Sequence, residues 1–475
     1  MVVVFVLIAL SVLGLLAGAH WYVWRRLVRD TTLPGGVARR AGTVAAIVLP
    51  LLSVGTLVAS QARAPFRVQQ VLAWPGYLWL AVLLYLVMAL VVGEMVRPLL
   101  RRVLVRRDAG VRGGGGAPDG PLPVAPDHGP AEGAGNSPSL GAATEASPSA
   151  SAPASASACA SAPAPASGGT DTVTQTPPPA PPVATPPAAP EGPAGSSASG
   201  DFSRRLFVSR VVGAGAAAAA LGTVGYGTYG VLRGPKLKRV RVPLAKLPRG
   251  AHGFRIAVVS DVHLGPVLGR AHTQRIVDTI NSAQPDLVAV VGDLVDGSVA
   301  DLGHAAEPLA RIRARHGMFF VTGNHEYFSG AEQWVDHVRE LGMRPLENDR
   351  VEIAGFDLAG VNDVAGEREG QGPDFVRALG DRDRTRASVL LAHQPIVIHD
   401  AVRHGVDLQL SGHTHGGQLW PGNYIAAQAN PTVAGLEKYG DTQLFVSRGA
   451  GAWGPPVRVG AESDITVVEL QSRQA

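Results

Sequence analysis

The chain has 475 residues with 42 Lys and Arg against 38 Asp and Glu, and its single cysteine is Cys159. The length predicts two or three structural units, and one cysteine excludes an intrachain disulfide and a cysteine-based zinc site. The basic residues lie beside apolar runs and form no stripe with interleaved aromatic residues, so we expect membrane topology to explain the net charge of +4 and expect no nucleic-acid partner.

Residues 1–107 are predicted to form a three-helix transmembrane region. Its apolar runs are Val2 to Tyr22, Ala41 to Ser60 and Trp74 to Val96. Each is close to the roughly 20 residues that cross a bilayer, and their near absence of charge disfavours buried helices of a soluble domain. The first run lacks a basic start and a small-residue cleavage site, which disfavours a cleaved signal peptide.

Arginines between the runs predict the orientation of this region. The loop after the first run and the segment after the third are rich in arginine, whereas the loop between the second and third carries only Arg63 and Arg67. The arginine-rich stretches contain Arg25, Arg26, Arg29, Arg39, Arg40, Arg97, Arg101, Arg102, Arg106 and Arg107. By the positive-inside rule, we expect a multi-pass plasma-membrane protein whose N-terminus is outside and whose chain is cytoplasmic after the third span.

Residues 108–200 are rich in Gly, Ala, Ser and Pro and contain almost no large apolar residue. Such a segment buries too little surface to offset the entropy of ordering. We therefore expect a disordered cytoplasmic linker.

Residues 201–250 are expected to return the chain to the membrane. Ser203 to Val208 resembles a twin-arginine export signal and precedes a fourth apolar run, Val211 to Leu232, and then a basic stem. The arginine pair is equally typical of an ordinary transmembrane helix with positive-inside flanks. Both interpretations place the following domain outside the cytoplasm, and only the first implies the twin-arginine export machinery as a partner. A helix lying on the membrane surface would instead leave that domain cytoplasmic.

Residues 251–475 have the pattern of an α/β domain. Short β-branched apolar runs each end in polar residues and alternate with helical stretches such as Ala271 to Ala283 and Gly330 to Leu341. The apolar runs are Arg255 to Ser260, Leu287 to Gly292, Met318 to Gly323, Ser388 to Ala392 and Asp407 to Gly412. Ligands collect at the carboxyl ends of such strands, and a hairpin is expected near residues 351–361.

The polar residues after these runs are Asp, Asn and His, which suit divalent first-row metals. Each motif alone is weak evidence, but five follow one another in order. They are Asp261-x-His263, Gly292-Asp293, Gly323-Asn324-His325-Glu326, His393 and Gly412-His413-Thr414-His415. This set resembles the calcineurin-like metallophosphoesterase family, whose fold is a four-layer α/β/β/α sandwich.

Further motifs resemble a bacterial membrane-associated branch of that family, which includes twin-arginine-exported phosphodiesterases and UDP-diacylglucosamine pyrophosphatase relatives. They are Leu391 to Pro395, Gly416 to Leu419, Val446 to Gly449 and Trp453 to Pro456.

The resemblance implies a site with two divalent metal ions, manganese, iron or zinc, that activate a water for attack on phosphorus. It implies that Asp261, His263 and His415 hold one ion, that Asn324, His393 and His413 hold the other, and that Asp293 bridges them. His325 would be the catalytic residue at the leaving group. Arg448 is a candidate phosphate contact, with a structural role as the alternative. Glu326 could orient His325, but we expect it to be a surface residue. Asp296 could be a further ligand, but we expect it to be a turn residue before Gly297.

We therefore expect a membrane-anchored phosphoesterase that cleaves phosphodiester or pyrophosphate bonds of lipid-linked or envelope-derived substrates outside the cytoplasm. A phosphomonoesterase acting on phosphorylated proteins or small molecules would use the same residues. A membrane receptor or scaffold with a catalytically inactive domain is the third alternative, although every residue whose loss would indicate it is present.

Overall fold

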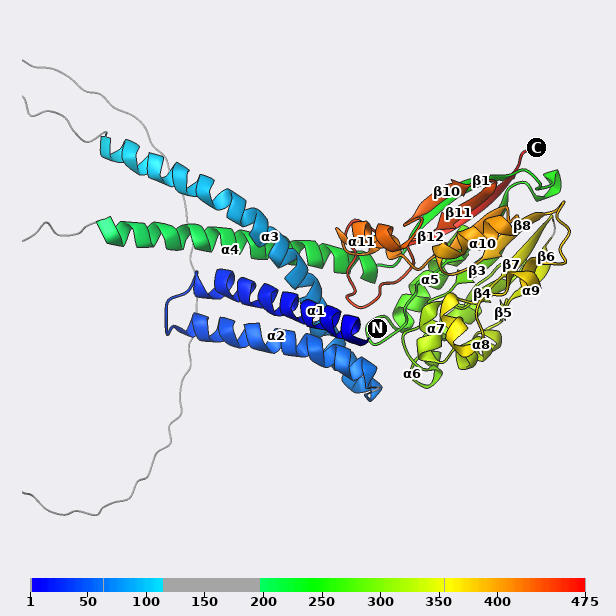
Figure 1. The fold of residues 1–475 in the computed structure, drawn as a ribbon, viewed down its shortest axis with the longest axis horizontal. Coiled ribbons are helices and arrows are strands. Elements are labelled where there is room, and N and C mark those ends of the chain that lie inside the picture. The colour runs from blue at the N-terminus through cyan, green and yellow to red at the C-terminus, as the bar shows by residue number, and fades with distance from the viewer. Residues whose placement is uncertain (1, 63, 114–196, 354, 475) are drawn as a thin grey trace, which may run out of the picture. The chain divides into compact units, whose positions relative to one another are not determined.

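The computed structural model describes residues 2–62, 64–113, 197–353 and 355–474 (Figure 1). Residues 114–196 contain most of the predicted linker and lie outside the described residues. The chain on either side of them, Met1–Arg107 and Ser197–Ala475, forms one compact unit.

Four helices cover the predicted membrane segments. They are α1 (Val2–Trp24), which continues as a short π-helix over Arg25–Arg29, α2 (Val37–Gln61), α3 (Phe66–Gly113) and α4 (Ser197–Leu232). Within the described residues, Val37–Gln61, Phe66–Leu104 and Arg205–Leu232 are long and apolar enough to cross a bilayer, which indicates membrane association. The segment that resembles a twin-arginine signal lies inside α4.

The segment after α1 contacts the interior parts of α3 and α4. Arg26, just after α1, lies 3.0 Å from Glu94 of α3, and Arg210 of α4 donates a hydrogen bond to the carbonyl of Thr31. Gly93 of α3 leaves room for Val212 of α4, since a Cβ at Gly93 would lie 2.6 Å from the Val212 side chain. The arginine-rich loop after α1 therefore lies beside the N-terminal half of α4, around Arg210.

The expectation of a basic stem is partly wrong, because Lys236–Leu244 forms strand β1 of the α/β domain. It pairs in parallel with β12 (Asp464–Ser472), and its apolar side chains Val242 and Leu244 are buried. The basic side chains remain at the surface, where Lys238 lies 2.7 Å from Asp464. The α/β domain therefore begins at residue 236, before the expected boundary at 251, because alternate positions of this basic segment are apolar and face the core.

Two mixed six-stranded sheets form the domain. The first has the order β1, β12, β2 (Phe254–Val259), β3 (Leu287–Val291), β4 (Met318–Val321) and β5 (Met343–Pro345). The second has the order β10 (Gly435–Tyr439), β11 (Thr442–Val446), β9 (Leu408–Ser411), β8 (Ala387–Leu391), β7 (Phe356–Gly360) and β6 (Asp349–Ile353). The antiparallel pair β6 and β7 is the predicted hairpin.

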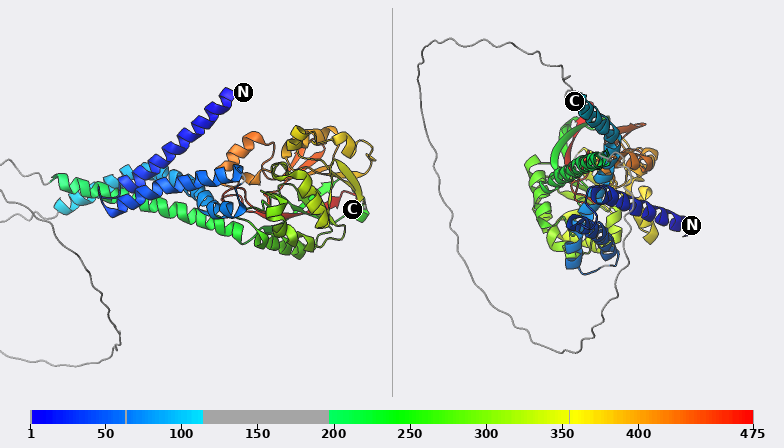
Figure 2. Two further views of the ribbon diagram at one scale, coloured as in Figure 1. Left: turned by 90° about the horizontal axis from the view of Figure 1, so that it is seen from below. Right: turned by 90° about the vertical axis from the view of Figure 1, so that its left-hand side faces the viewer.

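The sheets pack face to face, and helices cover their outer faces (Figures 1 and 2). Helices α5 (Arg270–Ala283), α6 (Val299–Ala306) and α8 (Ala331–Glu340) share a buried apolar cluster with the first sheet. Helices α9 (Phe375–Leu379) and α10 (Ile398–Arg403) do the same for the second sheet. The predicted four-layer α/β/β/α sandwich is confirmed, and α7 (Asn324–Ser329) and α11 (Gly422–Ala429) lie outside its main layers.

Candidate metal centre

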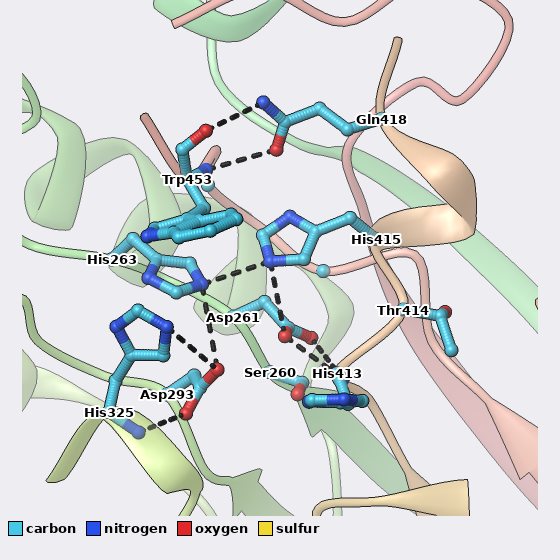
Figure 3. Close-up of polar contacts among 12 residues, drawn as sticks. Ser260, Asp261, His263, Asp293, His325, His413, Thr414, His415, Gln418 and Trp453 are labelled. Atoms are coloured by element: carbon cyan, nitrogen blue, oxygen red, sulfur yellow. Dashed lines mark hydrogen bonds and ion pairs between the residues drawn. The ribbon is translucent and has the colours of Figure 1, made fainter. Parts of the chain in front are cut away.

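The predicted ligand residues come together where β2, β3, β4, β8 and β9 end. Figure 3 shows Asp261, His263, Asp293, His413 and His415 among them. Glycines allow these strand ends to approach closely. A Cβ at Gly292 would lie 2.6 Å from the His393 ring, and a Cβ at Gly412 would lie 1.8 Å from the Ser260 hydroxyl. The Gly-Asp and Gly-His dipeptides of the sequence are therefore a packing requirement of the site.

Several of these residues have a left-handed backbone, which is unusual for residues with a side chain. Their φ angles lie between 48° and 73°. They are Asp261, His263, Asp293, His413 and His415. Such conformations cost free energy and persist where the surroundings impose them, and here they turn side chains from adjoining strands toward one point.

The first candidate metal group consists of Asp261, His263 and His415, which are all buried. One ligand atom from each lies within 4.8 Å of the others. The Nε2 atoms of His263 and His415 are 2.9 Å apart, and Nε2 of His415 is 3.4 Å from Asp261 (Figure 3). Two ring nitrogens and a carboxylate that converge in this way suit a borderline divalent cation.

The second group consists of Asp293, His393 and His413, and Asn324 lies beside it. Nε2 of His393 is 3.1 Å from the Asp293 carboxylate, and Nδ1 of His413 is 3.0 Å from the amide oxygen of Asn324. Nδ1 of His393 donates to the carbonyl oxygen of Val291, which leaves Nε2 free to face the site.

Asp293 lies between the two groups. Its Oδ2 atom is 3.7 Å from Nε2 of His263 and 3.1 Å from Nε2 of His393. Burial opposes ionisation of this carboxyl, but the nearby His393 and His263 rings outweigh burial and hold its pKa well below the usual range. An ionised carboxylate at this position can contact an ion in either group.

His413 and His415, which both follow strand β9, are held neutral. Burial, with a smaller effect of His393, lowers the pKa of His413 to about 4. Burial, then His263 and Arg458, lowers the pKa of His415 well below its ordinary value. Because a metal ligand must be unprotonated, these rings are available to a cation at neutral pH. These two neutral rings, together with the converging carboxylates of Asp261 and Asp293, therefore fit divalent metal ions.

Asp296 has a larger role than the expected turn residue. Its carboxylate accepts a hydrogen bond from Nδ1 of His263 at 2.8 Å and another from Nδ1 of His325 at 2.7 Å. Burial alone would lower the pKa of His263, but the Asp296 carboxylate outweighs burial and raises that pKa to about 9. Asp296 therefore orients both rings and leaves both Nε2 atoms facing the site.

The expectation that Glu326 lies at the surface is wrong. Its side chain is completely buried, and its carboxylate accepts hydrogen bonds from the main-chain amides of Asp293, Leu294 and Gly323. Burial, and then the charge of Asp293, raises its pKa to about 7. Glu326 therefore fixes the backbone that carries Asp293, a role that depends on the close approach of two strand ends and has no local sequence signal.

Two arginines lie next to the site. Arg448, the predicted phosphate contact, is half-buried, and its side chain lies against Gly416, the residue after His415. Arg458, which the sequence did not single out, is 4% exposed and lies 3.1 Å from Nδ1 of His415. Its only signal in the sequence is its position just after the Trp453 to Pro456 motif.

The chain is similar to known metallophosphoesterases. A family model described as "Calcineurin-like phosphoesterase" matches residues 254–417. A transmembrane protein with metallophosphoesterase domain from Danio rerio is 37% identical over 260 residues, which is 52% of this chain and 60% of that protein. The match therefore spans less than two thirds of the fish protein.

Bacterial relatives are covered more fully. An uncharacterized metallophosphoesterase of Helicobacter pylori is 37% identical over 271 residues, which is 56% of this chain and 72% of that protein. Another from Aquifex aeolicus is 34% identical over 243 residues, which is 50% of this chain and 92% of that protein.

Proposed function

Because this chain belongs to the calcineurin-like metallophosphoesterase family, we propose that it is a membrane-anchored hydrolase of phosphodiester or pyrophosphate bonds that uses two divalent metal ions. The observation that carries the proposal is the pair of ligand groups on either side of Asp293. Asp261, His263 and His415 would hold one ion, and Asn324, His393 and His413 the other, with Asp293 shared. Manganese, iron or zinc suits these nitrogen and oxygen donors.

When bound, the ions would activate a water molecule and neutralise charge on the phosphoryl oxygens. The chain's own residues supply the remaining chemistry. His325 has Nδ1 held by Asp296 at 2.7 Å and Nε2 at 4.0 Å from Asp293, so the ring edge faces the reacting group. A proton on Nε2 would pass to the leaving oxygen as its bond to phosphorus breaks.

Lipid-linked substrates are supported by aromatic residues at the site. The His325 ring lies 5.6 Å from Phe328 and 5.7 Å from Trp453, and both aromatic side chains are largely exposed. Next to Trp453, a Cβ at Gly454 would lie 3.9 Å from the ring of Tyr77 in the apolar helix α3. The leaving-group side is therefore apolar and adjoins a membrane helix, which favours an amphiphilic phosphate ester.

An extracytoplasmic catalytic domain is supported by the helix ends. The arginine-rich loop after α1 adjoins the N-terminal half of α4, around Arg210, and the catalytic domain follows the C-terminal end of that helix. If α4 crosses the bilayer with its arginines inside, the catalytic domain lies outside.

Arg448 would add a planar donor to a phosphate held beside Gly416.

The test is hydrolysis by the full chain in detergent micelles, with an aryl phosphodiester and an aryl phosphomonoester compared in manganese. Diester cleavage that a chelator abolishes, that manganese restores and that Asp293→Ala lacks is the expected result. Faster cleavage of the monoester would replace the proposed substrate class by phosphomonoesters. No metal-dependent cleavage of either compound or of a vesicle-borne pyrophosphate lipid would overturn the proposal.

A further inference from the structure

Arg458 is a buried cation whose donors all point into the protein. Its guanidinium donates to the main-chain carbonyls of Gly451 at 2.7 Å, His415 at 3.0 Å and Ala461 at 3.2 Å. A further nitrogen lies 3.1 Å from Nδ1 of His415. A buried charge is costly unless hydrogen bonds satisfy it, so the three carbonyl contacts tie the arginine to the backbone of His415 and of the neighbouring segments.

The backbone of Arg458 also contacts a membrane helix. Its amide donates to the carbonyl of Gly227 in α4 at 3.3 Å. A Cβ at Gly227 would lie 2.7 Å from the Val457 side chain and 2.8 Å from the carbonyl oxygen of Arg458. Only a glycine at position 227 lets α4 approach the 457–458 backbone this closely.

The segment around Arg458 has little freedom to move independently of α4. Val457 is fully buried in an apolar cluster that includes Val224 and Ala220 of α4. Val459 forms an isolated β-bridge with Leu419, only four residues after His415. A shift of α4 would therefore displace Arg458 and the 415–419 segment together, because packed interiors transmit displacements and do not absorb them.

We propose that Arg458 is a positioning residue that couples the position of helix α4 to the proposed metal ligand His415. Binding of the ion held by Asp261, His263 and His415 then depends on the contact with α4, whereas binding of the other ion does not. This inference rests on the proposed metal-binding role of these residues. The second ligand group serves as an internal reference for the affinity of the first. Among the contacts of the described residues, Arg458 has no hydrogen bond to Asp293, His393 or His413, so the affinity for the second ion should not depend on Arg458.

The experiment titrates manganese into the chelator-stripped full chain in detergent micelles and follows free manganese by its paramagnetic resonance signal. The unmodified chain should bind two ions. Arg458→Met should weaken one ion by about 10- to 100-fold, the usual effect of removing a group that orients a ligand, and leave the other unchanged. Arg458→Lys, which keeps the charge but loses the forked geometry, should weaken the same ion less.

Gly227→Ala tests the helix contact without touching the site. Its control is Gly225→Ala on the same helix, where a Cβ would meet nothing within 4 Å. Both substitutions favour the helix intrinsically, so a selective loss of one ion in Gly227→Ala alone is attributable to the contact with Val457 and Arg458.

Unchanged binding of both ions in Arg458→Met and Gly227→Ala would overturn the inference. So would an equal loss of both ions in Arg458→Lys, because a merely structural role would affect the two ligand groups alike. An unmodified chain that is folded, as its circular dichroism would show, but binds no manganese, iron or zinc would refute the proposed metal site itself, and the inference with it.

Discussion

The Asp296 carboxylate lies 2.7 Å from Nδ1 of His325, the proposed proton donor. The same oxygen lies 2.8 Å from Nδ1 of His263. One side chain thus fixes the orientation of a proposed metal ligand and of the proposed proton donor.

We expect Asp296→Asn to lower kcat by about 10- to 100-fold, because the neutral amide loses the negative charge that strengthens the hydrogen bonds to both rings. KM should change much less than kcat. Steady-state hydrolysis of an aryl phosphodiester at saturating manganese measures both constants. Asp278→Asn, at an exposed position of α5, is the control, and an Asp296→Asn variant as active as this control would contradict the assigned role.

The metal-free protein should lose stability at alkaline pH through the same contact. The pKa of His263 is raised to about 9 from an ordinary value of 6.5, so its contribution is complete below 6.5 and lost as pH rises through 9. The pKa of Asp296 is lowered to about 2 from 3.8, so its contribution is complete above 3.8 and lost as pH falls through 2. The difference in thermal stability between the chelator-treated chain and its Asp296→Asn variant should therefore be largest between pH 3.8 and pH 6.5, where both contributions are complete, and should shrink toward pH 9. A difference in thermal stability that stays constant up to pH 9 would refute the stabilising contact between His263 and Asp296.

Local sequence predicted the residues of the two candidate ligand groups and missed the residues that support them. Asp261, His263 and Asp293 stand directly after apolar strands, and strand ends gather ligands in any such sheet. The contacts of Asp296 and Glu326 were missed because their partners lie about 30 residues away on neighbouring strand ends. The basic composition of Lys236–Leu244 likewise hid an edge strand, since its pairing partner is the last strand of the fold.

His325→Gln should lower kcat by about 100- to 10,000-fold on substrates with a poor leaving group, because such substrates need a proton in the transition state. For a nitrophenolate leaving group, which is stable without a proton, the loss should be much smaller. A plot of log kcat against leaving-group pKa is therefore expected to be steeper for the variant than for the unmodified chain. Equal slopes would remove His325 from the role of proton donor.

Glu326→Gln should destabilise the catalytic domain by about 1–3 kcal/mol. The carboxylate accepts from three main-chain amides, whereas the glutamine NH₂ group would face at least one of these donors with a donor of its own. Thermal unfolding followed by intrinsic fluorescence measures the change. Glu340→Gln, at an exposed position of α8, supplies the comparison, and equal midpoints for the two variants would show that the buried carboxylate is dispensable.

The orientation of the helices predicts where a reporter fused after Ala475 will work. Strand β12 ends at Ser472 beside β1, which follows α4 directly, so the C-terminus lies on the same side of the membrane as the catalytic domain. An enzyme that folds only outside the cytoplasm should be active there, and a cytoplasm-only fluorescent reporter should be dark. A second fusion within residues 114–196 should give the opposite pair of signals. Matching signals at both positions would mean that α4 lies on the membrane without crossing it, and the catalytic domain would then act at the cytoplasmic leaflet.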